Sequence, residues 1–204
     1  MPIIYKDDIS IFFFHIPKCA GTSIEKAFVN NDFLMDLHNP KHAYKPLSRL
    51  FKCSPQHYHY NMVSSIVDLS SFDYCFTVIR DPIDRLISEY KMRAKHHVNP
   101  PGFNVWLKRI NSLYKKNPFI LDNHIRPQSD FIGGEVKVFD LSQGLGNIFN
   151  DVERELGITL HGASHSHASH GSELSNFSIN KTDLNEEDFE IIENLYSSDM
   201  ELFE

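Results

Sequence analysis

Residues 14–23 read Phe14-His15-Ile16-Pro17-Lys18-Cys19-Ala20-Gly21-Thr22-Ser23 and directly follow the apolar run Ile11-Phe12-Phe13. The aromatic and β-branched run predicts a buried strand, which Pro17 and Gly21 then end. Thr22 or Ser23 is suited to cap a helix that continues through Phe28. This stretch therefore predicts a strand, a tight turn and a helix, in that order.

A helix that begins directly after a strand and a tight turn is well suited to bind an anion. Its first N–H groups lack partners within the helix, and the helix dipole favours negative charge there. Lys18 adds a positive charge, and Thr22 and Ser23 add hydroxyl donors. The spacing differs from the ATP-binding pattern G-x-x-x-x-G-K-[ST], because Lys18 does not stand directly before the hydroxyl residue.

A second stretch has the same design. Residues 74–79 predict another buried strand, which ends at Arg80-Asp81-Pro82. Pro82 suits the first turn of a helix, and this helix would carry Ser88. Arginine binds phosphate well because its planar group donates two parallel hydrogen bonds. Both stretches fall at the carboxyl ends of predicted parallel strands, where open α/β sheets bind nucleotides.

The order Pro-Lys-x-x-Gly-Thr-Ser resembles the 5′-phosphosulfate loop of sulfotransferases that use PAPS (3′-phosphoadenosine 5′-phosphosulfate). In that family an arginine at a strand end and a serine eight residues later hold the 3′-phosphate, and Arg80 and Ser88 have this spacing. The resemblance implies PAPS as the donor and PAP as the product. It assigns donor binding to Pro17, Lys18, Cys19, Ala20, Gly21, Thr22, Ser23, Arg80 and Ser88.

The chemistry needs a base for the acceptor hydroxyl and positive charge for the leaving phosphate. Histidine is the natural base near neutral pH, and Lys18 supplies the charge. Uronyl 2-O-sulfotransferases have a His-x-His segment upstream of the 3′-phosphate arginine, which His57-Tyr58-His59 resembles. Either histidine could be the base, with His59 the first choice.

Two further segments resemble parts of this family. His124 and Arg126 belong to His-Ile-Arg-Pro-Gln, which the resemblance places in or behind the site wall, with Arg126 near acceptor or nucleotide. Asn176 and Ser178 belong to Asn-Phe-Ser, which resembles a C-terminal pattern of carbohydrate sulfotransferases that reaches back toward the nucleotide.

Other conspicuous residues have simpler interpretations. Cys19 is expected to fill a tight turn rather than act as a nucleophile, and His15 is expected to be structural. The histidines at 161, 165, 167 and 170 lie in a Ser- and Gly-rich stretch without a rigid frame, so no metal site is predicted. The three scattered cysteines favour a reducing compartment.

Composition predicts one domain over residues 1–204, with a loop at 161–172. The chain is 41% hydrophobic, which suits a P-loop-like three-layer α/β fold with a mainly parallel central sheet flanked by helices. No apolar run approaches the roughly 20 residues needed to span a bilayer, and the first residues lack a secretory signal pattern. Animal Golgi sulfotransferases of this type carry an N-terminal membrane anchor. We therefore expect this chain to be a cytoplasmic, bacterial relative of those enzymes.

The net charge of −7 is concentrated at one end of the chain. Residues 181–204 contain nine acidic residues and one lysine, so the remainder is close to neutral. This balance gives no support for a nucleic-acid partner, and it favours a neutral or lightly charged acceptor over a polyanion.

These observations predict direct, in-line transfer of a sulfuryl group from PAPS to a hydroxyl acceptor on a sugar or glycan. Two alternatives stay open: a nucleotide kinase or related NTPase, and a non-catalytic module that binds PAP.

Overall fold

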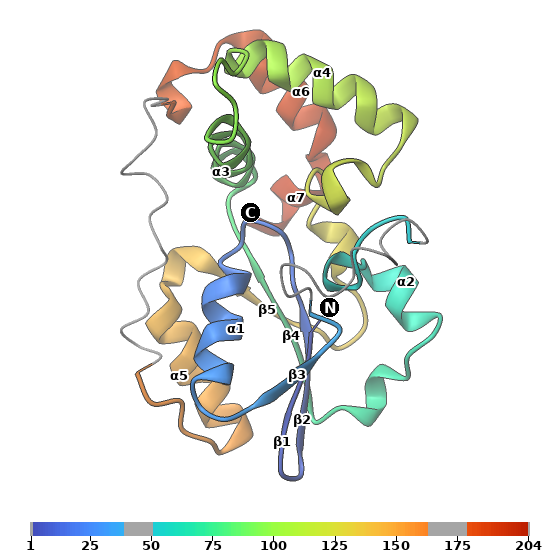
Figure 1. Cartoon of the computed structure of the whole chain (residues 1–204), viewed down its shortest axis with the longest axis vertical. Coiled ribbons are helices and arrows are strands. Elements are labelled where there is room, and N and C mark those ends of the chain that lie inside the picture. Colours follow the sequence, from blue (N-terminus) through green and yellow to red (C-terminus); the bar gives the residue numbers. More distant parts are fainter. Residues whose placement is uncertain (1, 39–50, 163–178, 204) are drawn as a thin grey trace.

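The computed structural model describes residues 2–38, 51–162 and 179–203. Figure 1 shows a central sheet with helices packed around it. The strands are β1 (Ile3–Lys6), β2 (Ile9–Phe14), β3 (Leu34–Asp36), β4 (Tyr74–Ile79) and β5 (Lys137–Asp140). The α-helices are α1 (Gly21–Val29), α2 (Tyr60–Ser64), α3 (Pro82–Ala94), α4 (Phe103–Lys116), α5 (Leu145–Leu156), α6 (Glu186–Leu195) and α7 (Ser197–Met200).

The two predicted strand-turn-helix units are confirmed. β2 leads through a short loop into α1, and β4 leads directly into α3. The two strands are parallel neighbours, with Phe12 paired to Cys75 and Phe14 paired to Thr77. The loops that follow them therefore emerge at the same edge of the sheet.

The prediction of a mainly parallel sheet is wrong, because the sheet is mixed. Its order is β3-β1-β2-β4-β5, and only the β2–β4 and β4–β5 pairs are parallel. β1 pairs antiparallel with β2 and with β3. The turn at Asp7 and Asp8 between β1 and β2 is so short that it can only return the chain antiparallel.

The alternating side chains of β2 pack into two different cores. Ile11 and Phe13 face α1 and α5, which lie together against one face of the sheet in Figure 1. Phe12 and Phe14 face the opposite side, where they pack with Val63 of α2. The sheet is thus buried on both faces, as expected for a layered α/β protein.

A third core lies beyond the carboxyl ends of the parallel strands. It joins α3, α4 and α6 through Leu86, Leu107 and Ile192, and these helices lie above the sheet in Figure 1. No helix in the described part of the chain is long and apolar enough to cross a membrane.

One helix boundary differs from the prediction. α1 begins at Gly21 after a left-handed Ala20, so Thr22 and Ser23 lie within its first turn rather than capping it. At the other end of the chain, Tyr196 separates α6 from α7.

Candidate functional site

The anion loop, residues 15–20, connects β2 to α1. Lys18 (φ 71°) and Ala20 (φ 62°) both adopt left-handed conformations, with Cys19 between them. Left-handed residues in such turns direct backbone N–H groups into a concave surface that suits anions. The Arg85 side chain fixes the loop from behind, since its Nε donates to the Pro17 carbonyl at 3.0 Å. Thr22 is exposed and Ser23 half-buried at the start of α1.

One cavity is lined by residues of both predicted phosphate-binding motifs, with Lys18 from the first motif; Thr22 and Ser23 are not among its lining residues. It has a volume of about 1080 Å³ and is lined by Lys18, Arg80 and Ser88. Lys91, Lys95 and Lys181 add positive charge to its walls, although Lys181 also pairs with Asp81 at 2.8 Å. Burial lowers the pKa of Lys18. The cavity thus offers cationic groups from both β–α units.

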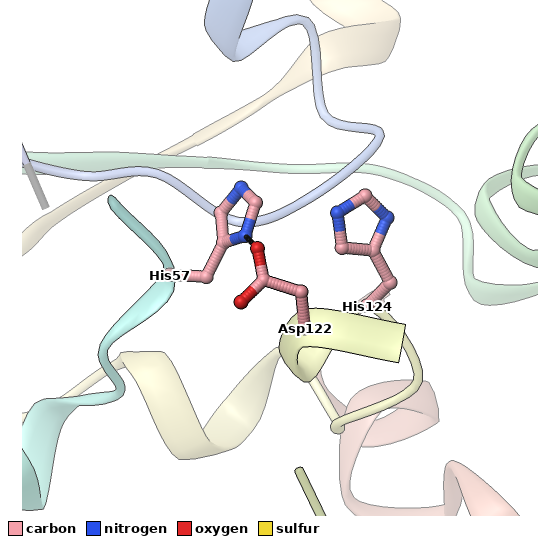
Figure 2. A group of neighbouring side chains, drawn as sticks. All are labelled: His57, Asp122 and His124. Atoms are coloured by element: carbon pink, nitrogen blue, oxygen red, sulfur yellow. Dashed lines mark hydrogen bonds and ion pairs between the residues drawn. The ribbon is translucent and has the colours of Figure 1, made fainter. Parts of the chain in front are cut away.

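His57 lies beside the anion loop, next to the ring of His15, and is oriented by a carboxylate. Its Nδ1 donates to Oδ2 of Asp122 at 2.9 Å, and Ser54 Oγ lies 3.3 Å from the same nitrogen. In Figure 2 the other ring nitrogen points away from Asp122. Burial lowers the pKa of His57 despite the opposing carboxylate, so the imidazole is neutral at neutral pH.

Asp122 lies in a strained turn. Leu121, Asp122 and Asn123 have φ values of 52°, 61° and 68°, three left-handed residues in a row without glycine. Each such residue costs on the order of 1–2 kcal/mol. The turn is held by His57 itself, because Asn123 Nδ2 donates to the His57 carbonyl at 2.8 Å. Burial alone would raise the pKa of Asp122, but hydrogen bonds from His57 and Ser54 lower it to about 2.

His124 belongs to a second buried histidine–carboxylate pair. Its Nδ1 donates to Oε2 of Glu89 at 2.7 Å, and Arg93 Nε donates to the other carboxylate oxygen at 2.7 Å. Against the effect of burial, these partners lower the pKa of Glu89 to about 2. The His124 ring stands nearly perpendicular to that of His57, with centroids 4.8 Å apart. Arg85 links this pair to the anion loop, because its Nη2 donates to the His124 carbonyl at 3.0 Å and its Nε donates to the Pro17 carbonyl.

His15 completes a row of three imidazoles. Its Nδ1 is bound by Glu25, and its ring centroid lies 5.2 Å from that of His57. The ring packs against the start of α1, where a Cβ added to Gly21 would lie 2.4 Å from it. Its side chain is buried and paired, in keeping with the structural role expected for it.

His59 and Arg126 lie farther from this row of imidazoles. His59 Nδ1 is buried and has no hydrogen-bond partner among the described residues, and its ring packs beside Phe119. Arg126 is held by Asn123 at 2.8 Å and by Asp130 at 2.6 Å. Arg126 therefore contacts the turn that supports His57, and His57 has the carboxylate partner that His59 lacks.

The remaining predicted residues have the following places. Cys19 is buried, and burial raises the pKa of its thiol to about 12, which suits a turn-filling role. Asn176 and Ser178, and most of the expected loop at 161–172, lie outside the described residues.

His57, Asp122 and His124 each offer a ligand atom within 4.8 Å of the others, a spacing that a metal ion could use.

Sequence reasoning missed several side chains of this site. Asp122, Glu89 and Gln128 are buried or half-buried polar groups whose partners are distant in the chain. Asp122 and Gln128 do lie in or beside the His-Ile-Arg-Pro-Gln segment, and Glu89 directly follows Ser88. Their position beside motif residues was the available signal.

Comparison with known proteins agrees with the geometry. Neither the curated proteins nor the solved structures gave a significant match. A family model described as the sulfotransferase family matches residues 1–204, the whole length of the chain. Such a match supports sulfuryl transfer in general as the activity of this chain. The chain is therefore a member of the sulfotransferase family.

Proposed function

We propose that this protein transfers a sulfuryl group from PAPS to a hydroxyl group of a carbohydrate. One observation carries the proposal: Lys18, Arg80 and Ser88, from two separate β–α units, line the same cavity. PAPS has charged groups at both ends of its ribose, and the cavity offers cationic groups from both units. A volume of about 1080 Å³ is at the upper end of the range for ligand pockets, so a nucleotide of this size can enter.

Different residues would bind the two charged ends of PAPS. Lys18, Thr22, Ser23 and the first N–H groups of α1 would hold the 5′-phosphosulfate, with the loop backbone of Pro17, Cys19, Ala20 and Gly21 shaping the cradle. Arg80 and Ser88 would hold the 3′-phosphate. Lys18 and the helix N-terminus would then stabilise the charge that develops on the leaving phosphate.

We propose His57, rather than His59, as the base. Asp122 holds the proton on Nδ1 of His57, so Nε2 carries the free lone pair. Nε2 would take the proton as the acceptor oxygen attacks sulfur and the sulfur–oxygen bond to the 5′-phosphate breaks. A neutral imidazole with a lowered pKa is in the correct protonation state at neutral pH.

Donor binding is tested by calorimetry with PAP and ATP. We expect wild type to bind PAP and to bind ATP negligibly, and Arg80→Ala to weaken PAP at least about tenfold through loss of a charge-assisted contact. Arg109→Ala, on the exposed face of α4, is the matched control. Absence of PAP binding by folded wild type would contradict the proposal, and preference for ATP would favour a kinase.

The base is tested by turnover with a panel of sugar acceptors. We expect His57→Gln to lower kcat about 10²–10⁴-fold with little change in PAP affinity, which is the usual contribution of a general base. His59→Gln should retain most activity. The reverse result would restore His59 as the base, and PAP binding with no turnover by wild type would indicate a non-catalytic module.

A further inference from the structure

One buried side chain joins the two phosphate-binding motifs. The Gln128 amide is fully buried and contacts both of them. Its Oε1 accepts from the backbone N–H of Arg80 at 2.9 Å and from the Cys19 thiol at 3.2 Å. Its Nε2 donates to the Arg80 carbonyl at 2.8 Å. The same amide thus binds the end of β4 and the middle of the anion loop.

Gln128 is itself held in place by Asp199, a fully buried residue of α7. The backbone N–H groups of Gln128 and Ser129 donate to the two carboxylate oxygens of Asp199, at 2.8 Å and 2.9 Å. Two contacts join the motif units directly: Arg80 Nη1 lies 3.4 Å from the Lys18 carbonyl, and Arg85 Nε donates to the Pro17 carbonyl at 3.0 Å. The Gln128 amide adds a buried link from outside both units, and it contacts the backbone of Arg80 itself.

We propose that Gln128 is a positioning residue that sets the distance between the 5′-phosphosulfate and 3′-phosphate subsites. The proposal rests on the function proposed above. A ligand with two charged groups gains affinity when its second group finds its subsite already at the right distance. Loss of the Gln128 side-chain hydrogen bonds should reduce this gain in affinity. Each subsite should still bind a single phosphate as before.

The experiment compares three nucleotides by calorimetry: PAP, adenosine 5′-monophosphate and adenosine 3′-monophosphate. Gln128→Met keeps the size of the side chain and removes all three hydrogen bonds. We expect this variant to weaken PAP binding about tenfold or more, because the two subsites are no longer pre-organised. The affinity for each monophosphate should change less than about threefold. Gln143→Met, at an exposed glutamine, is the control and should change none of them.

A second variant guards against failure to fold. Cys19→Ala removes the contact between Gln128 and the anion loop, together with the longer thiol contact to the Pro17 carbonyl at 3.8 Å. It should show a smaller loss of the same kind, confined to PAP. Unchanged PAP affinity in folded Gln128→Met would overturn the inference, as would equal weakening of all three nucleotides. If wild type binds no PAP at all, the proposed function fails first and the inference with it.

Discussion

At the scale of single residues, the site is built on carboxylates that orient imidazole rings. Three histidines each present Nδ1 to a carboxylate, in the pairs His15–Glu25, His57–Asp122 and His124–Glu89. An ionised carboxylate can only accept, so it fixes the proton on Nδ1 and leaves Nε2 as the basic nitrogen. His57 stands in the middle of the row and has its partner in a strained turn, which indicates that its orientation matters to function.

The first prediction concerns this orientation. Asp122→Asn keeps the shape of the side chain but allows its amide to donate to Nδ1, which favours the wrong tautomer of His57. We expect kcat to fall about 10- to 100-fold, less than for loss of the base itself. PAP affinity should change little, because Asp122 does not line the donor cavity. Steady-state kinetics beside PAP calorimetry separates the two effects.

Asp151→Asn is the matched control, because Asp151 lies on α5 and pairs only with the exposed Arg154. It should leave kcat unchanged. Full activity of Asp122→Asn in folded protein would show that the carboxylate does not act on the base.

At the scale of elements, the close approach of the β2 end to the α1 start shapes the anion loop. Gly21 is required there because the His15 ring occupies the space of a side chain. The added methyl group of Gly21→Ala must displace either the His15 ring or the start of α1. We therefore expect this variant to lower the free energy of unfolding by about 1–3 kcal/mol, as overpacking does. It should also weaken PAP binding, since the displaced helix start is the anion site. Urea unfolding and calorimetry measure the two effects.

The same exchange at Gly102 is the control. Gly102 precedes α4, and a Cβ there would meet no atom within 4 Å. Gly102→Ala should be close to neutral for both stability and PAP binding. Equal stability of Gly21→Ala and wild type would mean that the His15 ring can move away without cost.

The elements that carry the motifs were predictable because their signals are local. The strand that leads into the anion loop and the strand at 74–79 follow directly from the sequence pattern. The sequence analysis missed β1, because Ile3–Lys6 is too short to show an alternating pattern. Since β1 pairs antiparallel with β2, the mixed character of the sheet was missed as well. The start of α1 was misplaced because left-handed Ala20, rather than a hydroxyl cap, precedes it.

The candidate site also contains some residues that the sequence predicts and others that it does not. Lys18, Arg80 and Ser88 were identified by spacing within short motifs, and one cavity collects them. The partners of these motifs were not predictable, because His57 meets Asp122 across 65 residues and Arg80 meets Gln128 across 48. Pairings over such distances depend on the assembled fold, and nothing in the composition of either segment specifies them.

At the scale of the whole molecule, the site lies where the three cores meet. α3 belongs to the core above the sheet, yet it directs Arg85 at the anion loop, Ser88 to the wall of the cavity and Glu89 at His124. Ser88 and Glu89 are neighbours, so a single helix carries a lining residue of the cavity and the partner of an imidazole. The buried polar groups are therefore as much part of the fold as of the chemistry.

The final prediction follows from this burial and concerns stability against pH. His57 and His124 have pKa values lowered by burial, so below the ordinary value of about 6.5 the unfolded chain binds protons that the folded protein does not. Glu89 and Asp122 have pKa values of about 2, so their contribution is present above their ordinary values and is lost as the pH falls toward 2. Both effects have the same sign.

We therefore expect the free energy of unfolding to be nearly constant between about pH 7 and pH 8 and to fall steadily below that range, as linkage requires. Urea unfolding at a series of pH values measures this slope. The double variant His124→Gln with Glu89→Gln should flatten the decline, because it removes one titrating pair and retains a hydrogen bond between two amides. Glu193→Gln, exposed on α6, should leave the slope unchanged. Wild-type stability that rises on acidification would mean that the buried imidazoles are already protonated in the folded protein, and His57 could then not serve as the base.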